Sequence, residues 1–107
     1  MNPDATSPVH PDILRLVPQL KIARTFWQRA MGLMGKRRLA AGHGMLFPHC
    51  RSIHTCFMRF PLDVIFLDGE NRPVKIIRNL KPWRMARGGS RARSVLEVQS
   101  GWLPPGI

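Results

Sequence analysis

Two carboxylates of this chain fall inside predicted strands, and their chemistry needs a partner. Asp63 and Glu97 lie within apolar runs, whereas the other acids fall near the N-terminus or beside a turn. An unpaired buried charge is costly. Arg29 is the preferred partner of Asp63, because Arg59 would lie roughly 13 Å away along the same strand. The Arg29–Asp63 pair is either a structural ion pair or the edge of a cleft that holds an anionic ligand.

Soft metal-ligating side chains are concentrated in ten residues: His49, Cys50, His54, Cys56 and Met58. Imidazole, thiolate and thioether groups favour zinc or copper(I). The spacing matches neither a zinc knuckle nor a Cys-x-x-Cys redox motif, and core packing explains Cys56 and Met58 equally well. A zinc or copper site centred on His54, Cys50 and Cys56 is one alternative, but no metal or other cofactor is assigned.

Nucleophilic catalysis has little support. Ser52, His54 and Asp63 are suitable residue types, but Ser52 and His54 are two residues apart and no nucleophile elbow is present. No catalytic residue is assigned. The sequence favours a protein without catalytic activity and leaves an enzyme open.

Positive charge is the next chemical signal. The formal net charge is +11, from 17 Lys and Arg against 6 Asp and Glu. Positions 72–93 contain eight basic residues and no acid; the first six, at every third position, are Arg72, Lys75, Arg78, Lys81, Arg84 and Arg87. This stretch would attract polyanions non-specifically, although a solvated surface tuned for solubility explains it too. No helix-turn-helix, zinc-finger or RNP-like motif accompanies it, so nucleic acid is a conceivable partner without a motif to indicate it.

Length and composition predict one domain. A chain of 107 residues buries roughly two-thirds of its unfolded surface. No run approaches 18 consecutive apolar residues, so no membrane span is predicted. The proline-rich segment 1–12 is expected to be a disordered arm and lacks the features of a signal peptide. Residues 13–107 then form a single β-rich domain, and a cytoplasmic location is the default expectation.

Hydrophobic periodicity places one short helix among four or five strands. A capping box at Thr25 and Gln28 predicts a helix over 26–34. Strands are expected at 19–23, at the apolar run 45–47, at 57–67 paired with 73–78, and at 92–99, with 79–90 as a loop. The expected fold class is α+β, mostly antiparallel sheet, closing towards a small, partly closed barrel.

The longest predicted strand has an unbroken apolar face. At every second position it carries Met58, Phe60, Leu62, Val64 and Phe66. This alternation predicts that these side chains share one side of the core.

Four motifs in order resemble domain-of-unknown-function family 192. They are Arg29-x-x-Gly32-Leu33-Met34-Gly35, Gly44-Met45-Leu46-Phe47, His54-x-x-Phe57-Met58-x-x-Pro61-Leu62-Asp63 with its apolar continuation to Asp68, and Ala92-x-x-Val95-Leu96-Glu97-Val98-x-x-Gly101. The resemblance covers about residues 21 to 101. It implies a compact, β-rich single domain with a short helix, and no agreed activity comes with it.

Three functions therefore remain open. The leading hypothesis is a non-enzymatic binding or accessory domain, in which a pocket near Arg29, His54 and Asp63, or the loop of Trp83, meets a small ligand or a protein partner. Trp83 either caps one end of the sheet or serves as an aromatic anchor for a partner. The alternatives are a polyanion binder that uses the basic stretch and a soft-metal protein.

Overall fold

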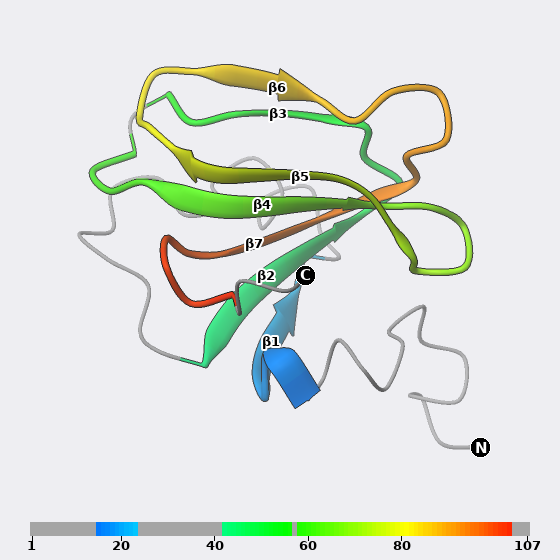
Figure 1. Cartoon of the computed structure of the whole chain (residues 1–107), viewed down its shortest axis with the longest axis horizontal. Coiled ribbons are helices and arrows are strands. Elements are labelled where there is room, and N and C mark those ends of the chain that lie inside the picture. Colours follow the sequence, from blue (N-terminus) through cyan, green and yellow to red (C-terminus); the bar gives the residue numbers. More distant parts are fainter. Residues whose placement is uncertain (1–14, 24–41, 57, 104–107) are drawn as a thin grey trace.

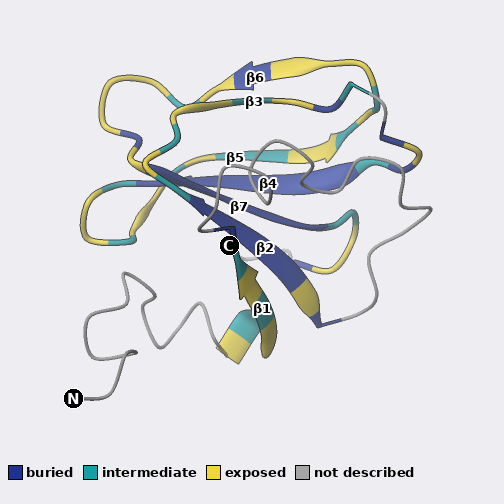
Figure 2. Ribbon diagram, turned by 180° about the vertical axis from the view of Figure 1, so that it is seen from behind, coloured by how far each residue is buried: buried dark blue, intermediate teal, exposed yellow. Residues whose placement is uncertain are grey.

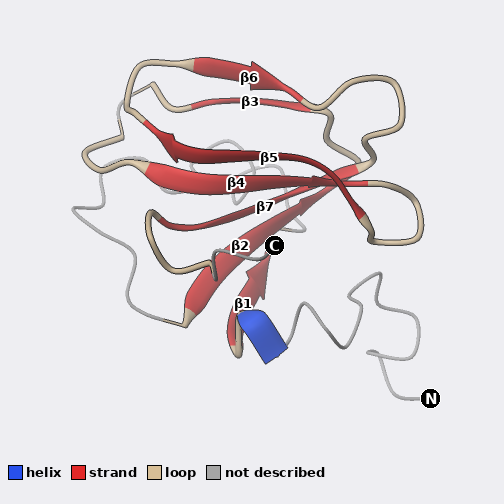
Figure 3. Ribbon diagram, viewed as in Figure 1, coloured by secondary structure: helices blue, strands red, loops and turns tan. Residues whose placement is uncertain are grey.

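The computed structural model describes residues 15–23, 42–56 and 58–103, and these are mostly β-strand (Figures 1 and 3). The strands are β1 (Gln19–Ile22), β2 (His43–Pro48), β3 (Ser52–His54), β4 (Leu62–Leu67), β5 (Pro73–Leu80), β6 (Met85–Arg87) and β7 (Ser94–Gln99). Five of them form one sheet in the order β1-β2-β7-β4-β5, and β3 pairs with β6 in a second sheet.

The predicted fold class is confirmed only in its β-rich part. The helix expected at 26–34, the arm at 1–12 and Arg29 lie outside the described residues. The expected closure towards a barrel is wrong, because the five-stranded sheet is open, with β1 and β5 at its two edges. The last strand, β7, lies in the centre of the sheet and pairs antiparallel with β2 on one side and β4 on the other. The β1–β2 pair is parallel.

The hairpin β4–β5 is confirmed, but β4 begins at Leu62 rather than Phe57. Pro61 lacks the N–H that a ladder requires. Met58 and Phe60 nevertheless belong to the same core cluster as Leu62, Val64 and Phe66. The alternating apolar pattern thus predicted burial correctly over a longer segment than the strand itself.

The loop expected at 79–90 is wrong in part. Strand β5 continues to Leu80, and residues 85–87 form β6. Ile53 of β3 is the register partner of Ala86 of β6, and both pack against the main core. Strands of three residues are too short to show a period, so tertiary packing rather than local sequence defines this pair.

Two apolar clusters lie on opposite faces of the five-stranded sheet. One includes Phe47, Phe66 and Val95, and the β3–β6 sheet covers it. The other contains Leu46, Ile65, Leu96 and Val98 together with Val17 and Leu103. Figure 2 shows β2, β4 and β7 buried along most of their lengths. Asp63 and Glu97, at 1% and 6% exposure, are therefore both core residues.

Within the described residues, no helix is long and apolar enough to cross a membrane.

Candidate ligand-binding site

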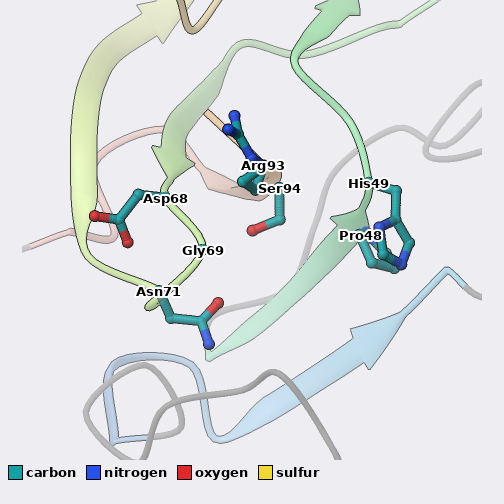
Figure 4. A pocket seen from close by; sticks show the side chains of 7 residues that line it. All are labelled: Pro48, His49, Asp68, Gly69, Asn71, Arg93 and Ser94. Carbon is teal, nitrogen blue, oxygen red and sulfur yellow. The ribbon is translucent and has the colours of Figure 1, made fainter. Parts of the chain in front are cut away.

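Three strands of the large sheet meet at Ser94. This residue begins β7 and is the register partner of both Pro48, which ends β2, and Leu67, which ends β4. A cavity of about 300 Å³ opens beside this junction, hereafter the Ser94 pocket (Figure 4). Its lining residues are Pro48, His49, Asp68, Gly69, Asn71, Arg93 and Ser94.

The turn between β4 and β5 forms one wall of the Ser94 pocket. Asp68 Oδ1 accepts hydrogen bonds from the backbone N–H groups of Glu70 at 2.8 Å and Arg72 at 2.9 Å. The bond from Arg72, followed by that from Glu70, holds the pKa of Asp68 below its usual value. Asn71 occupies the left-handed region at φ 63°, which asparagine tolerates. Its N–H donates to the Asp68 carbonyl at 3.0 Å, which fixes the wall.

The opposite wall is held by Arg93. Its backbone N–H donates to the Leu67 carbonyl at 2.7 Å, and its own carbonyl accepts from the Cys50 N–H at 3.0 Å. Its Nη1 donates to the carbonyls of Ser90 at 2.7 Å and Ala92 at 2.9 Å. The guanidinium points away from the cavity in Figure 4, so Arg93 serves mainly to join three segments.

Ser94 carries the unusual feature of the pocket. The residue is 5% exposed, and its Oγ is a buried atom with no hydrogen-bond partner among the described residues. Leaving a buried hydroxyl unsatisfied costs about 1–3 kcal/mol. Figure 4 shows Ser94 Oγ and the Asn71 amide directed into the cavity, whereas the Asp68 carboxylate lies on the outer side of the turn. The interior therefore presents two uncharged groups that can each donate and accept a hydrogen bond.

The pocket contains Ser, His and Asp, but these residues do not form a catalytic triad. A triad needs the histidine hydrogen-bonded to the serine hydroxyl, with the carboxylate behind the histidine. Ser94 Oγ has no partner within the described structure, so His49 does not activate it. Asp68 is turned away across the cavity (Figure 4). The arrangement is suited to binding and lacks a proton relay.

The Asp63 carboxylate accepts hydrogen bonds from two backbone groups. Its Oδ1 accepts the backbone N–H of Asn79 at 2.8 Å, and its Oδ2 accepts that of Gly101 at 3.0 Å. Its neighbours along β4, Leu62 and Val64, face the core under the β3–β6 sheet, so Asp63 faces the other side. The structure does not bring Asp63 together with the exposed His54 of β3.

The soft side chains do not converge. His54 Nδ1 accepts the Cys56 backbone N–H at 3.3 Å, and Cys50 Sγ donates to the Ser52 carbonyl at 2.9 Å. Both cysteines are free thiols. Across the described segments, no three His, Cys, Asp or Glu side chains are grouped so that they could hold a metal ion. This arrangement does not support the soft-metal alternative.

Trp83 lies on a loop that is held by hydrogen bonds to Thr55. Its N–H donates to the carbonyl of Thr55 at 3.0 Å. Thr55 Oγ1 in turn donates to the Lys81 carbonyl at 2.6 Å and accepts the Arg84 N–H at 2.9 Å. Trp83 is 58% exposed and Met85 is 70% exposed. Both interpretations of Trp83, as a cap of the sheet and as an anchor for a partner, stay predictions.

The basic stretch is spread over a turn, two strands and a loop. Besides Arg93, three of its side chains have intramolecular contacts. Arg72 Nη2 lies 2.6 Å from Glu70 Oε2. Lys75 Nζ donates to the Arg87 carbonyl at 2.9 Å, and Arg78 Nη1 donates to the Leu103 carbonyl at 3.3 Å.

Sequence reasoning missed the Ser94 pocket. The turn 68–72 gave a signal, since Asp and Asn are typical turn residues. Ser94 gave none, because its burial depends on the register of β7 against two strands that come earlier in the chain.

The family model for domain of unknown function 192, described as an uncharacterised ACR, matches residues 11–105. The chain belongs to this family. The β-rich part of the fold expected from the resemblance agrees with this assignment.

Several relatives share most of the domain. A UPF0127 protein of Pyrococcus horikoshii is 41% identical over 86 residues, which cover 78% of this chain and 74% of that protein. A UPF0127 protein of Pyrococcus abyssi is 34% identical, with coverage of 78% and 73%.

Two crystal structures are similar. A Novosphingobium aromaticivorans protein of unknown function has a TM-score of 0.68 at 28% identity, over 77% of this chain and 63% of that one. This chain thus spans less than two-thirds of the Novosphingobium protein. A Sinorhizobium meliloti protein with the provisional name of a transcription regulator has a TM-score of 0.70 at 27% identity, over 78% and 69%.

Proposed function

We propose that this family-192 domain is a non-catalytic binding domain that holds a small, uncharged polar ligand in the Ser94 pocket. The observation that carries the proposal is the buried hydroxyl of Ser94, a residue in the lining of a cavity, which has no hydrogen-bond partner among the described residues. Buried polar atoms in proteins are almost always satisfied, so an exception beside a cavity is expected to serve a ligand.

The lining defines the ligand class. Ser94 Oγ and the Asn71 amide each donate and accept, so the matching ligand carries an amide or neighbouring hydroxyl groups. Pro48 supplies apolar surface beside them. The charged groups of Asp68 and Arg93 are turned outwards, which favours a neutral ligand. A cavity of about 300 Å³ lies at the small end of the range for ligand pockets, so the ligand is small.

The experiment is a backbone-amide NMR titration with three small probes: acetamide, N-acetylglycinamide and glucose. We expect at least one probe to give saturable shifts at His49, Asn71 and Ser94. Ser94→Ala should abolish these shifts. Ser100→Ala is the matched control, because it removes an exposed serine hydroxyl that bonds Asn79 Oδ1 at 3.0 Å, away from the pocket.

Two results would overturn the proposal. One is saturation that is unchanged in Ser94→Ala, and the other is the absence of saturable shifts around Ser94 with every probe.

Nucleic-acid binding is the second candidate, favoured by the net charge of +11 and by the provisional name of the Sinorhizobium neighbour. Lys81 and Arg84 are the members of the basic stretch to change, since both are exposed beside Trp83. Binding of a short thymidine oligonucleotide should weaken steeply with salt, and Lys81→Gln with Arg84→Gln should reduce that salt dependence. Unchanged affinity in the double variant would exclude this surface.

A further inference from the structure

A second pocket lies at the end of the β3–β6 sheet. Its cavity of about 340 Å³ is lined by Arg51, Ser52, Arg87, Gly89 and Ser90 and is hereafter the Arg51–Arg87 pocket. Arg93 separates it from the Ser94 pocket, because its side chain bonds the carbonyl of Ser90 while its backbone pairs with Leu67. The two pockets share no lining residue.

The backbone around the second pocket is held in place. Ser52 and Arg87 are register partners, and the Gly88 N–H donates to the Arg51 carbonyl at 2.8 Å. Gly88 packs directly on the core, since a Cβ there would lie 2.4 Å from Phe66 Cδ1. The Ala92 N–H closes the following turn on the Gly89 carbonyl at 3.2 Å. The two arginines therefore project from a rigid frame.

The charge of the pocket is uncompensated. Arg51 and Arg87 are exposed, and neither guanidinium has a hydrogen bond or ion pair with another described residue. No acidic side chain is among the lining residues. Lys75 adds a third positive charge, because its ammonium lies 2.9 Å from the Arg87 carbonyl.

The remaining lining suits an oxyanion. Ser52 and Ser90 place hydroxyl groups beside the arginines. Gly89 has φ +92°, and a Cβ there would meet nothing within 4 Å, so the backbone is open to a ligand. Guanidinium groups bind phosphate oxygens in bidentate fashion, and hydroxyl donors complete the shell of a tetrahedral anion.

We propose that the Arg51–Arg87 pocket binds a phosphate dianion, either inorganic phosphate or the terminal phosphate of a small phosphomonoester. This proposal is independent of the neutral ligand proposed for the Ser94 pocket. An extended nucleic acid fits less well, because Arg72 is paired with Glu70 and Arg78 bonds the Leu103 carbonyl. The local pocket, rather than the whole basic stretch, is the site.

The test is an amide NMR titration of the full chain, at constant ionic strength in chloride, with inorganic phosphate and separately with adenosine 5′-monophosphate. We expect saturable shifts centred on residues 51–52 and 87–90. Arg51→Gln and Arg87→Gln should each weaken binding by about tenfold, because each removes one charge-assisted contact. Tighter binding of the nucleotide would identify a phosphomonoester, and equal binding would identify phosphate itself.

Arg72→Gln is the matched control, since it removes one exposed arginine charge outside the pocket. Equal weakening by Arg72→Gln would show non-specific charge attraction and overturn the proposal. Non-saturating shifts, or a short thymidine oligonucleotide that binds tighter than the nucleotide, would do the same. Ser94→Ala should leave phosphate binding unchanged, so the outcomes for the two pockets are distinguishable.

Discussion

Asp63 Oδ2 accepts a hydrogen bond from the Gly101 backbone N–H at 3.0 Å, across 38 residues of sequence. The other carboxylate oxygen accepts the Asn79 N–H at 2.8 Å. Asn79 and Gly101 both have positive φ, so this one side chain of β4 fixes the tight ends of the two neighbouring strands, β5 and β7. Asp63, one of the predicted ligand-binding residues, therefore holds strand ends of the sheet together.

Replacing Asp63 should destabilise the fold. Asp63→Ala removes two charge-assisted acceptors and leaves two backbone N–H groups without partners, so we expect the free energy of unfolding to fall by about 3 kcal/mol. Urea unfolding measures the change. Glu70→Gln is the control, since its exposed ion pair with Arg72 should contribute at most about 1 kcal/mol. A loss for Asp63→Ala no larger than that of the control would contradict this role.

Glu97 should make stability depend on pH. Met45 and Val64 are its register partners on the two sides, and burial raises its pKa to about 8. The folded state keeps a proton that the unfolded chain releases near the ordinary value of 4.5. The free energy of unfolding should therefore decrease as the pH rises from about 4.5 to about 8, by on the order of a few kcal/mol, and then level off.

Glu97→Gln isolates this effect, because the amide has a similar shape and does not titrate. In urea unfolding at a series of pH values, the variant should match the wild type near pH 5 and be more stable near pH 8. Parallel pH profiles for the two proteins would show that Glu97 does not titrate in this window.

Thr55 should control the Trp83 loop. Thr55→Val keeps the shape but loses the donor to the Lys81 carbonyl and the acceptor for the Arg84 N–H. We expect a loss of about 1–3 kcal/mol and faster hydrogen exchange of the Arg84 amide. Thr55→Ser retains the hydroxyl and is the matched control for the exchange measurement. Slow exchange in both variants would mean that the loop is held by other contacts.

Ser94→Ala should show that the buried Ser94 hydroxyl does not stabilise the folded state. Removing a buried hydroxyl without a partner should leave the free energy of unfolding unchanged or raise it by up to about 1 kcal/mol. Ser100→Ala should change it in the opposite direction, because it breaks the bond to Asn79. Thermal and urea unfolding of both variants measure this difference in sign. A clear destabilisation by Ser94→Ala would point to a structural partner for the hydroxyl.

The local pattern was informative where burial is periodic. Every second residue from Met58 to Phe66 is predicted to share one face of the core, and the pairing that forms the β4–β5 hairpin is predicted as well; the structure confirms both. The local pattern did not predict β3 and β6, because a strand of three residues is stabilised by pairing with its partner strand. It also failed for barrel closure, which depends on the strand order rather than on any single strand.

The sequence by itself determined the family, the β-rich class, the two core-forming strands β4 and β7, and the surplus of positive charge. These follow from residue types and from the period of two along a strand. Tertiary structure decided the rest. The tertiary structure makes Asp63 an acceptor for two backbone N–H groups. It buries the Ser94 hydroxyl in the lining of a pocket, without a hydrogen-bond partner among the described residues. It also places Arg51 and Arg87 in the lining of one pocket. Each of these three arrangements depends on pairing between residues far apart in the chain. The register between strands is fixed by packing of the whole sheet, so it cannot be read from the few residues that end up as neighbours.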